Sequence, residues 1–183
     1  GGNFKTDPPL NNITKPSIID TDHADAYSYP QDYLLPWKGL TRGYNYNIME
    51  IKWDTIDRFD PPQERVRYNI GATNDYANNR FTDLAKMIPS KSICSTTYCL
   101  ADPGNEYLVF QPNNSTISVY SLIDGETYTY EWFNTETYSV TQSGINFVAS
   151  GSSVNLSPPY GNAVLFLKRS NASGAPSTVR NNR

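Results

Sequence analysis

The segment Thr127-Tyr128-Thr129-Tyr130-Glu131-Trp132-Phe133 alternates large aromatic residues with smaller or charged ones, and this alternation decides the fold class of the second half of the chain. Side chains two residues apart lie on the same face of a strand, so Tyr128, Tyr130 and Trp132 share one face. A second segment, Ala163-Val164-Leu165-Phe166-Leu167, is almost continuously apolar. Such a run predicts a central strand that is covered on both faces.

Short strand-forming runs surround these two segments from residue 106 onward. Turn-forming residues separate the runs, among them Asn113-Asn114, Asp124-Gly125 and Gly144. Strands with turn signals about every 8–12 residues predict a small antiparallel β-sandwich. The predicted strands are Tyr107–Gln111, Thr116–Leu122, Thr127–Asn134, Tyr138–Gln142, Ile145–Ala149, Ser153–Leu156 and Ala163–Lys168.

The preceding part of the chain mixes strand and helix signals. Two strands are predicted, Ser17–Asp20 and Tyr46–Trp53, and a loop rich in Tyr and Pro follows the first of them through Pro36. A helix begins at Pro61-Pro62, because proline is tolerated in the first turn, and continues to about Asn79. The whole chain is therefore predicted to be an α+β protein.

Composition excludes several classes of function. The 183 residues carry a formal net charge of −3, and basic residues do not form the stripe that nucleic-acid binding requires. No apolar run approaches the roughly 20 residues of a membrane span. No phosphate-binding loop or dinucleotide-binding glycine pattern is present, so we expect no cofactor.

The cysteines and the glycosylation motifs bear on the cellular compartment. Cys94 and Cys99 are the only cysteines and are predicted to form a disulfide, with free thiols as the alternative. A zinc site is disfavoured because four ligands are usual and His23 is the only histidine, so we expect no metal. Together with the Asn-x-Ser/Thr glycosylation motifs given next, the disulfide predicts a secreted protein. Asn-x-Ser/Thr motifs begin at Asn12, Asn113, Asn114, Asn155 and Asn171.

The run Asp20-Thr21-Asp22-His23, with Arg42-Gly43 after it, resembles a motif of a family of glycoside hydrolases with an apiosidase-like (β/α)₈ barrel. Lys15-Pro16-Ser17-Ile18-Ile19-Asp20-Thr21-Asp22-His23 resembles a late barrel strand, and Trp37-Lys38-Gly39-Leu40-Thr41-Arg42-Gly43-Tyr44-Asn45 resembles the segment that follows it. Pro103-Gly104-Asn105-Glu106-Tyr107-Leu108-Val109-Phe110 resembles the start of the β-sandwich that is labelled the collagen-binding domain of a collagenase. The resemblance extends from about Lys15 to Lys168.

The resemblance implies a division of the chain. Residues 1–101 are expected to hold the last strands and helix of a (β/α)₈ barrel, 102–169 a β-sandwich accessory domain, and 170–183 a flexible tail. A complete barrel needs about 250 residues, so we expect the chain to lack most of the barrel and to be inactive alone.

The candidate catalytic residues lie where the first strand ends. Asp20 and Asp22 point the same way if strand alternation continues that far, and His23 or Arg42 would orient a carboxylate or a sugar. Glycoside hydrolysis generally needs two carboxylates, and the second is expected from a strand outside the chain. The alternative is that Asp20 and Asp22 cap a turn and that His23 has a structural hydrogen bond.

The candidate substrate-binding residues are Trp37, Arg42 and Asn45, with Tyr128 and Trp132 in the second half. Aromatic side chains present flat apolar surface with a polar group, which suits sugar rings or a collagen-like surface. The alternative is that the aromatic face at Tyr128 and Trp132 fills the sandwich core, as a sandwich this small requires.

Two functions remain open at this point. In the first, the chain belongs to an extracellular carbohydrate-active protein whose β-sandwich supports or targets a catalytic barrel. In the second, it is a non-catalytic glycosylated subunit of an extracellular assembly or filament. The expected partners are a carbohydrate or matrix-like polymer, the missing barrel portion, or further copies of the chain.

Overall fold

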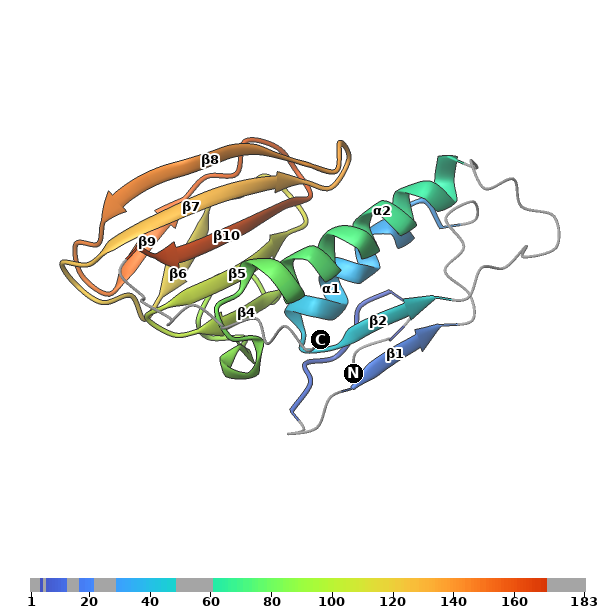
Figure 1. Cartoon of the computed structure of the whole chain (residues 1–183), viewed down its shortest axis with the longest axis horizontal. Helices are drawn as coiled ribbons and strands as arrows, with labels where there is room; N and C mark the ends of the chain where they lie inside the picture. The colour runs from blue at the N-terminus through green and yellow to red at the C-terminus, as the bar shows by residue number, and fades with distance from the viewer. Residues whose placement is uncertain (1–3, 5, 13–16, 22–28, 49–60, 171–183) are drawn as a thin grey trace, which may run out of the picture.

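The protein mixes helices and mostly antiparallel sheet, which confirms the predicted α+β class (Figure 1). The computed structural model describes residues 4, 6–12, 17–21, 29–48 and 61–170, and the account below concerns these residues. The two helices of regular α-geometry are α1 (Leu35–Thr41) and α2 (Pro61–Asp75). A π-helical turn, Tyr76–Arg80, continues α2, and a 3₁₀ turn, Asp32–Leu34, precedes α1.

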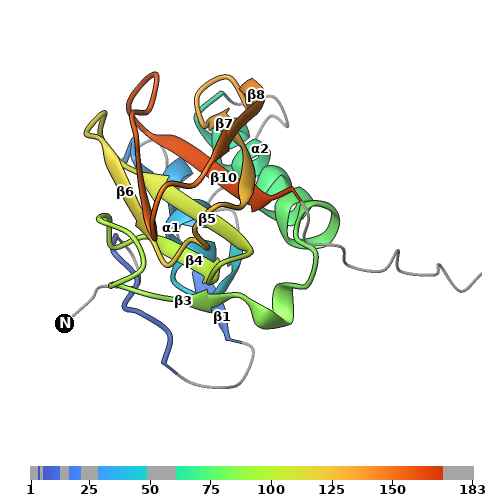
Figure 2. The ribbon, with the colours of Figure 1, turned by 90° about the vertical axis from the view of Figure 1, so that its left-hand side faces the viewer.

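A six-stranded antiparallel sheet forms the largest part of the fold. Its strand order is β3-β4-β5-β10-β7-β8, so the strand β10, although last in sequence, lies between β5 and β7 (Figure 2). The prediction of a central, doubly covered strand at Ala163–Leu167 is confirmed, because all five residues are buried. The strands are β3 (Ile88–Pro89), β4 (Cys99–Asp102), β5 (Glu106–Gln111), β7 (Thr127–Asn134), β8 (Ser139–Val148) and β10 (Ala163–Arg169).

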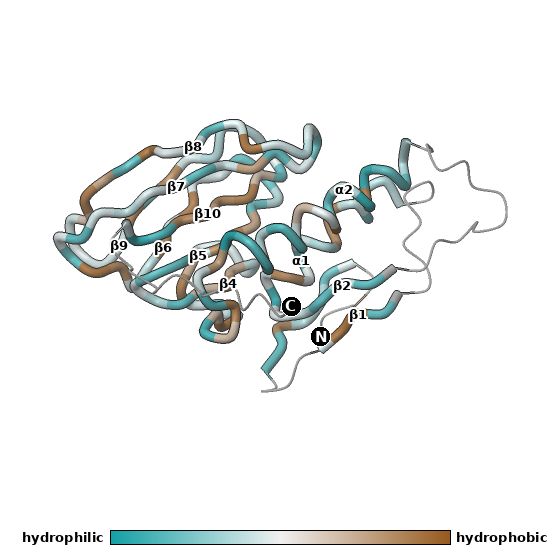
Figure 3. Tube along the Cα trace, viewed as in Figure 1, coloured by the Kyte–Doolittle hydropathy of each residue, from teal (hydrophilic) through white to brown (hydrophobic). Residues whose placement is uncertain are grey.

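Both faces of the central part of this sheet are covered, which explains why β5 is buried along its whole length, whereas the edge strand β8 is mostly exposed. One face packs against α1 and α2 through a core that includes Trp37, Tyr76 and Phe133. The other face packs against a two-stranded antiparallel sheet of β6 (Ile117–Tyr120) and β9 (Ser153–Leu156). Figure 3 shows the apolar residues that this double burial requires along β10.

A second small sheet lies on the far side of the helices. The strands β1 (Ile18–Thr21) and β2 (Asn45–Ile48) are parallel and are connected through α1, with Ile18 opposite Asn45 and Asp20 opposite Asn47. One face packs on α1: a methyl group added at Gly39 would lie 3.5 Å from the Tyr46 ring and 3.6 Å from Ile19. Figure 1 shows the helices between this pair of strands and the six-stranded sheet.

The structure corrects two predictions about elements. The region before Pro36 was expected to be a loop, but Leu35 begins α1, with Pro36 in its first turn, where proline is tolerated. The two strands predicted on either side of Gly144 are one strand, β8, in which Gly144 adopts a positive φ of 69°. Glycine tolerates that conformation, so the strand continues through the residue that predicted a turn.

The expected domain limits remain predictions. The six-stranded sheet includes β3 and β4, which both begin before residue 102, so the sheet begins before the expected start of the accessory domain. The expected tail lies outside the described residues from 171 onward.

Candidate functional site

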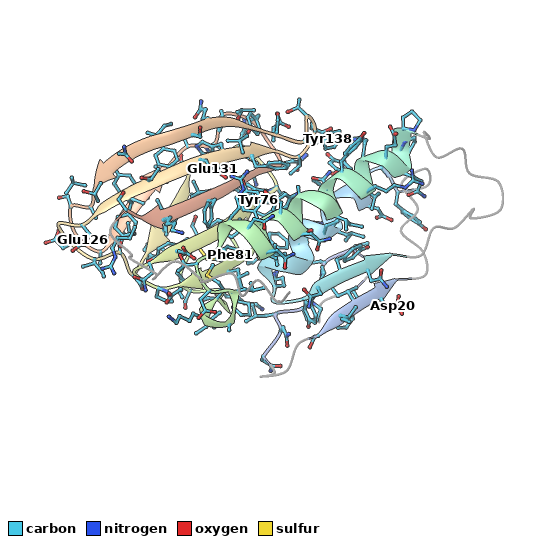
Figure 4. The ribbon with its side chains drawn as sticks, viewed as in Figure 1. Asp20, Tyr76, Phe81, Glu126, Glu131 and Tyr138 are labelled. Atoms are coloured by element: carbon cyan, nitrogen blue, oxygen red, sulfur yellow. A yellow bond between two sulfur atoms is a disulfide. The ribbon has the colours of Figure 1, made fainter. Side chains whose placement is uncertain are left out.

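The carboxyl ends of β1 and β2 form a polar edge that carries the one sequence-predicted catalytic residue the structure describes. Asp20 is exposed and lies opposite Asn47, which is also exposed (Figure 4). Residues paired across parallel strands point to the same face, so the carboxylate and the amide lie on one face of the sheet. Asp22 and His23 lie outside the described residues.

The face that carries Asp20 is open. Ile18 lies on the same face and is 66% exposed, whereas Ile19 on the opposite face is 3% exposed. Parallel sheets in proteins are almost always covered on both faces, and their strands carry apolar residues for that reason. Ile18 is therefore an apolar side chain exposed on a face that is usually covered in parallel sheets.

Asp20 alone does not make a hydrolytic site. It is the only acidic residue in β1 and β2, and glycoside hydrolysis generally uses a pair of carboxylates on either side of the scissile bond. Within the described ranges, no group of three or more His, Cys, Asp or Glu side chains is placed to hold a metal ion. The edge supplies one carboxylate and hydrogen-bonding amides.

Arg42 and Asn45 do not join Asp20. Asn45 is exposed at the start of β2, opposite Ile18, and Arg42 follows α1 at the amino end of β2. The Arg42 guanidinium is buried, lies 3.6 Å from Asp7 and stacks 4.7 Å from the ring centre of Tyr98. Arg42 thus orients a carboxylate, but that carboxylate belongs to Asp7 and not to Asp20.

Trp37, Tyr128 and Trp132 are core residues. Their exposed fractions are 0%, 0% and 1%, so no ring face is open to a ligand, and the predicted substrate contact is wrong for these three residues. The Trp37 indole donates to the Asn69 side chain at 2.7 Å, and the Tyr128 hydroxyl donates to the Gly104 carbonyl at 2.8 Å. The alternative interpretation, in which the aromatic face at 128–132 fills the core, is the one the structure shows.

The predicted disulfide is confirmed: Cys94 and Cys99 are bonded to each other. The side chains of Asn12, Asn113, Asn114 and Asn155 are exposed, and Asn171 lies outside the described residues. In the part of the chain that the structure describes, no helix has the length and apolar character needed to cross a membrane.

Comparison with known proteins supports a glycoside hydrolase-like fold. No family model and no curated protein matches the sequence. A solved structure described as a glycoside hydrolase matches with a TM-score of 0.52 and 11% identity, covering 78% of this chain and 37% of its own. A glycoside hydrolase family 5 protein from Bacteroides vulgatus has a TM-score of 0.52 and 12% identity, covering 78% of this chain and 36% of its own.

A further Bacteroides vulgatus structure assigned as a glycoside hydrolase matches with a TM-score of 0.54 and 14% identity. That match covers 85% of this chain and 36% of the other. The chain thus spans little more than a third of the length of these structures, and at this identity the likeness concerns the fold.

Proposed function

We propose that the chain is the C-terminal part of an extracellular, carbohydrate-active protein of the glycoside hydrolase type. In this proposal β1, α1, β2 and α2 are the last strands and helices of a (β/α)₈ barrel, with Asp20 at the carboxyl-end rim where such barrels hold their active sites. One observation carries the proposal: the parallel pair β1–β2 is covered by helices on one face and presents Ile18, Asp20, Asn45 and Asn47 on the open face.

A barrel accounts for both faces of the pair. Helices surround a (β/α)₈ barrel on the outside, and layers of side chains from alternate strands fill its interior. Ile19 and Tyr46 face α1 as outward residues would, and Ile18 would enter an interior layer. The exposed apolar surface of Ile18 is then buried by the other barrel strands.

The antiparallel sheets are the accessory part in this proposal. The six-stranded sheet shares one core with α1 and α2, including Trp37 from α1 and Phe133 from β7, so it holds the helices of the barrel wall in place. The finer assignment, an apiosidase-like barrel with a β-sandwich of the collagen-binding type, belongs to the same proposal. The disulfide and the exposed Asn-x-Ser/Thr motifs support an extracellular location.

The test is the size and activity of the native protein. An antibody against the chain should isolate one of two products. The first is a longer polypeptide that includes a whole barrel of about 250 residues, and the second is a tight complex with another chain that supplies the missing part of the barrel. The isolated material should hydrolyse a glycan, and Asp20→Asn should lower kcat by at least about 100-fold. Asp124→Asn, the same change at an exposed carboxylate in the turn between β6 and β7, is the matched control and should retain most activity.

A second function is favoured by the same open face. Another chain of an extracellular assembly would bury Ile18 equally well, and the protein would then be a glycosylated structural subunit without catalysis. The first proposal would be overturned, and this one favoured, by two results together. The denatured polypeptide would have the 20.6 kDa mass of the chain after removal of sugars, and the native protein would be a large homogeneous assembly without hydrolytic activity.

A further inference from the structure

A groove separates one face of α2 from the end of the β7–β8 hairpin, on the opposite side of the helices from Asp20. Its volume is about 380 Å³, within the range of small-molecule sites. Figure 4 shows Tyr76 and Tyr138 on its two sides. The helix contributes Arg67, Tyr68, Gly71 and Asp75 at helical spacing, and the hairpin contributes Tyr138 and Ser139.

The two walls are fixed relative to each other by polar contacts. Asn69 on α2 donates to the carbonyl of Thr135 in the hairpin turn at 3.1 Å. Arg65 of α2 forms an ion pair with Glu136 of the same turn. The Tyr68 and Tyr138 rings stack across the mouth with their centres 4.7 Å apart. The groove is therefore preformed, which lowers the entropic cost of binding a ligand.

Two residues of the groove are of types that are unfavourable in the backbone conformations they adopt. Gly71 lies inside α2, where glycine is unfavourable, yet a methyl group added there would meet no atom within 4 Å. Tyr138 holds a positive φ of 57°, a conformation that bulky residues rarely adopt. Packing does not require the glycine, whereas the Tyr138 ring packs against the core around Trp37 and stacks on Tyr68. Local conflicts of this kind are expected at functional sites, and here both lie in one groove.

The charge of Arg80 gives the groove no preference for an anion. Arg80 forms ion pairs with Asp75 at 2.9 Å and with Glu131 at 2.7 Å, so its charge is already balanced. The Tyr76 hydroxyl donates to the same Glu131 carboxylate at 2.6 Å, and burial, followed by that hydrogen bond, raises the pKa of Tyr76. The floor is a set of fixed hydrogen-bonding groups, and the 52% exposed Tyr68 supplies ring surface at the mouth.

We propose that this groove binds a neutral saccharide unit of a glycan. One sugar ring would lie over the open backbone at Gly71, with a C–H face against the Tyr68–Tyr138 pair and hydroxyls toward Arg67, Asp75 and Ser139. The choice of a saccharide over another neutral ligand rests on the proposed function. The groove lies on the sheet side of the helices, whereas Asp20 lies on the β1–β2 side, so it is a second site and not part of the rim.

The experiment is a glycan array probed with the 183-residue chain, followed by titration calorimetry with the best-retained neutral oligosaccharide. Gly71→Ala should raise Tm, because alanine favours the helix, and should weaken binding at least tenfold, because its methyl group occupies the floor. Asn74→Ala, an exposed change on the same helix away from the groove, should leave binding unchanged. Tyr138→Gly should abolish binding, while Tyr138→Phe should retain it.

Different results would contradict the saccharide groove and the proposed hydrolytic function. If no neutral glycan is retained, or if Gly71→Ala and Tyr138→Gly bind as tightly as the parent chain, the saccharide groove is wrong. Hydrolysis by the native protein without groove binding would overturn the groove alone. Groove binding in a native protein that hydrolyses no glycan would overturn the proposed catalytic function and leave the groove standing.

Discussion

At the residue scale, a buried polar contact helps to hold the junction between the helices and the six-stranded sheet. Trp37 and Asn69 are both fully buried, and the indole N–H donates to the Asn69 carbonyl oxygen at 2.7 Å. The Asn69 amide donates in turn to the carbonyls of Arg65 and Thr135. One side chain thus satisfies groups from α1, α2 and the β7–β8 turn.

We expect Asn69→Ala to lower the free energy of unfolding by about 1–3 kcal/mol, because it leaves the Trp37 donor buried without a partner. Combined with Trp37→Phe in a double-mutant cycle, it should show a coupling energy of about 0.5–3 kcal/mol in urea unfolding experiments. Asn74→Ala on the exposed side of α2 is the control, with an expected change within about 0.5 kcal/mol. Strict additivity of the two buried changes would contradict this interpretation of the contact.

Buried tyrosines predict a loss of stability in alkali. Burial raises the pKa of Tyr107 to about 12, and burial together with the hydrogen bond to Asp7 raises that of Tyr98 to about 12. The folded state holds these protons more tightly than the unfolded chain, in which tyrosine has a pKa of about 10. The stabilisation is therefore complete below about pH 10 and is lost as the pH rises from about 10 to 12.

Urea unfolding at increasing pH measures this effect. The free energy of unfolding should fall above about pH 10, and Tyr107→Phe should flatten the decline even if it lowers stability at neutral pH. Tyr120→Phe, at a 41% exposed position, is the matched control. An unchanged slope in Tyr107→Phe would show that this hydroxyl does not contribute to the alkaline transition.

At the element scale, the disulfide joins the two antiparallel sheets. Cys94 forms an isolated bridge with Val119 in β6, whereas Cys99 lies in β4 of the six-stranded sheet. The bond therefore connects the layers that enclose the core around Trp132 and Leu165.

Reduction of this disulfide should lower stability only moderately. The cysteines are 5 residues apart in sequence, and closing so short a loop stabilises a protein by roughly 2 kcal/mol in the chain-entropy model. For a protein of this size, that corresponds to a decrease in Tm of about 4–8 °C. Calorimetry of the Cys94→Ser/Cys99→Ser double variant checks the value, and a chain that fails to fold would show that the bond is essential to assembly.

The elements also show what the sequence could and could not predict. β7, β9 and β10 were predicted within a residue, because alternation and apolar content directly reflect burial in short strands. The helix α1 was missed because Pro36 and Gly39 disfavour helices in general, although the first turn tolerates Pro36 and Gly39 brings α1 close to β1 and β2. The sequence pattern of an aromatic strand face is the same whether another sheet covers that face or not. The burial of Tyr128 and Trp132 could therefore be established only from the structure.

The candidate site was predicted only in part for a related reason. A carboxylate after a short apolar run marks the end of a strand, and Asp20 lies there. The groove combines α2 with a hairpin about 60 residues later in the chain, so no local pattern predicts it. The available signal was Gly71, a glycine inside a predicted helix.

At the scale of the whole molecule, the sheets differ in how far their strands are buried and paired. β5 and β10 are buried on both faces and paired on both edges, whereas β1 and β2 pair with each other in the described chain and have one open face. Local stability follows burial and backbone pairing, so the two sheets should open with different free energies.

Hydrogen exchange of the isolated chain should show this difference. The amides of β5 and β10 should exchange only through global unfolding, and those of β1 and β2 should exchange much faster. In the native protein isolated with the antibody, the proposed barrel would cover the open face, so the β1–β2 amides should exchange more slowly there and those of β10 should be unchanged. Equal protection of both sheets in a monomer would contradict the proposal that Ile18 needs cover.

The position of β10 between β5 and β7 has a consequence for biosynthesis. A ribosome makes β3–β4–β5 and the β7–β8 hairpin first, and neither can complete the sheet until Ala163–Arg169 leaves the exit tunnel. Until then the nascent chain exposes two unpaired strand edges flanked by apolar side chains, the kind of surface that promotes aggregation. Ribosome-associated chaperones and the rate of translation through residues 149–169 should therefore affect the yield of this protein more than its equilibrium stability does.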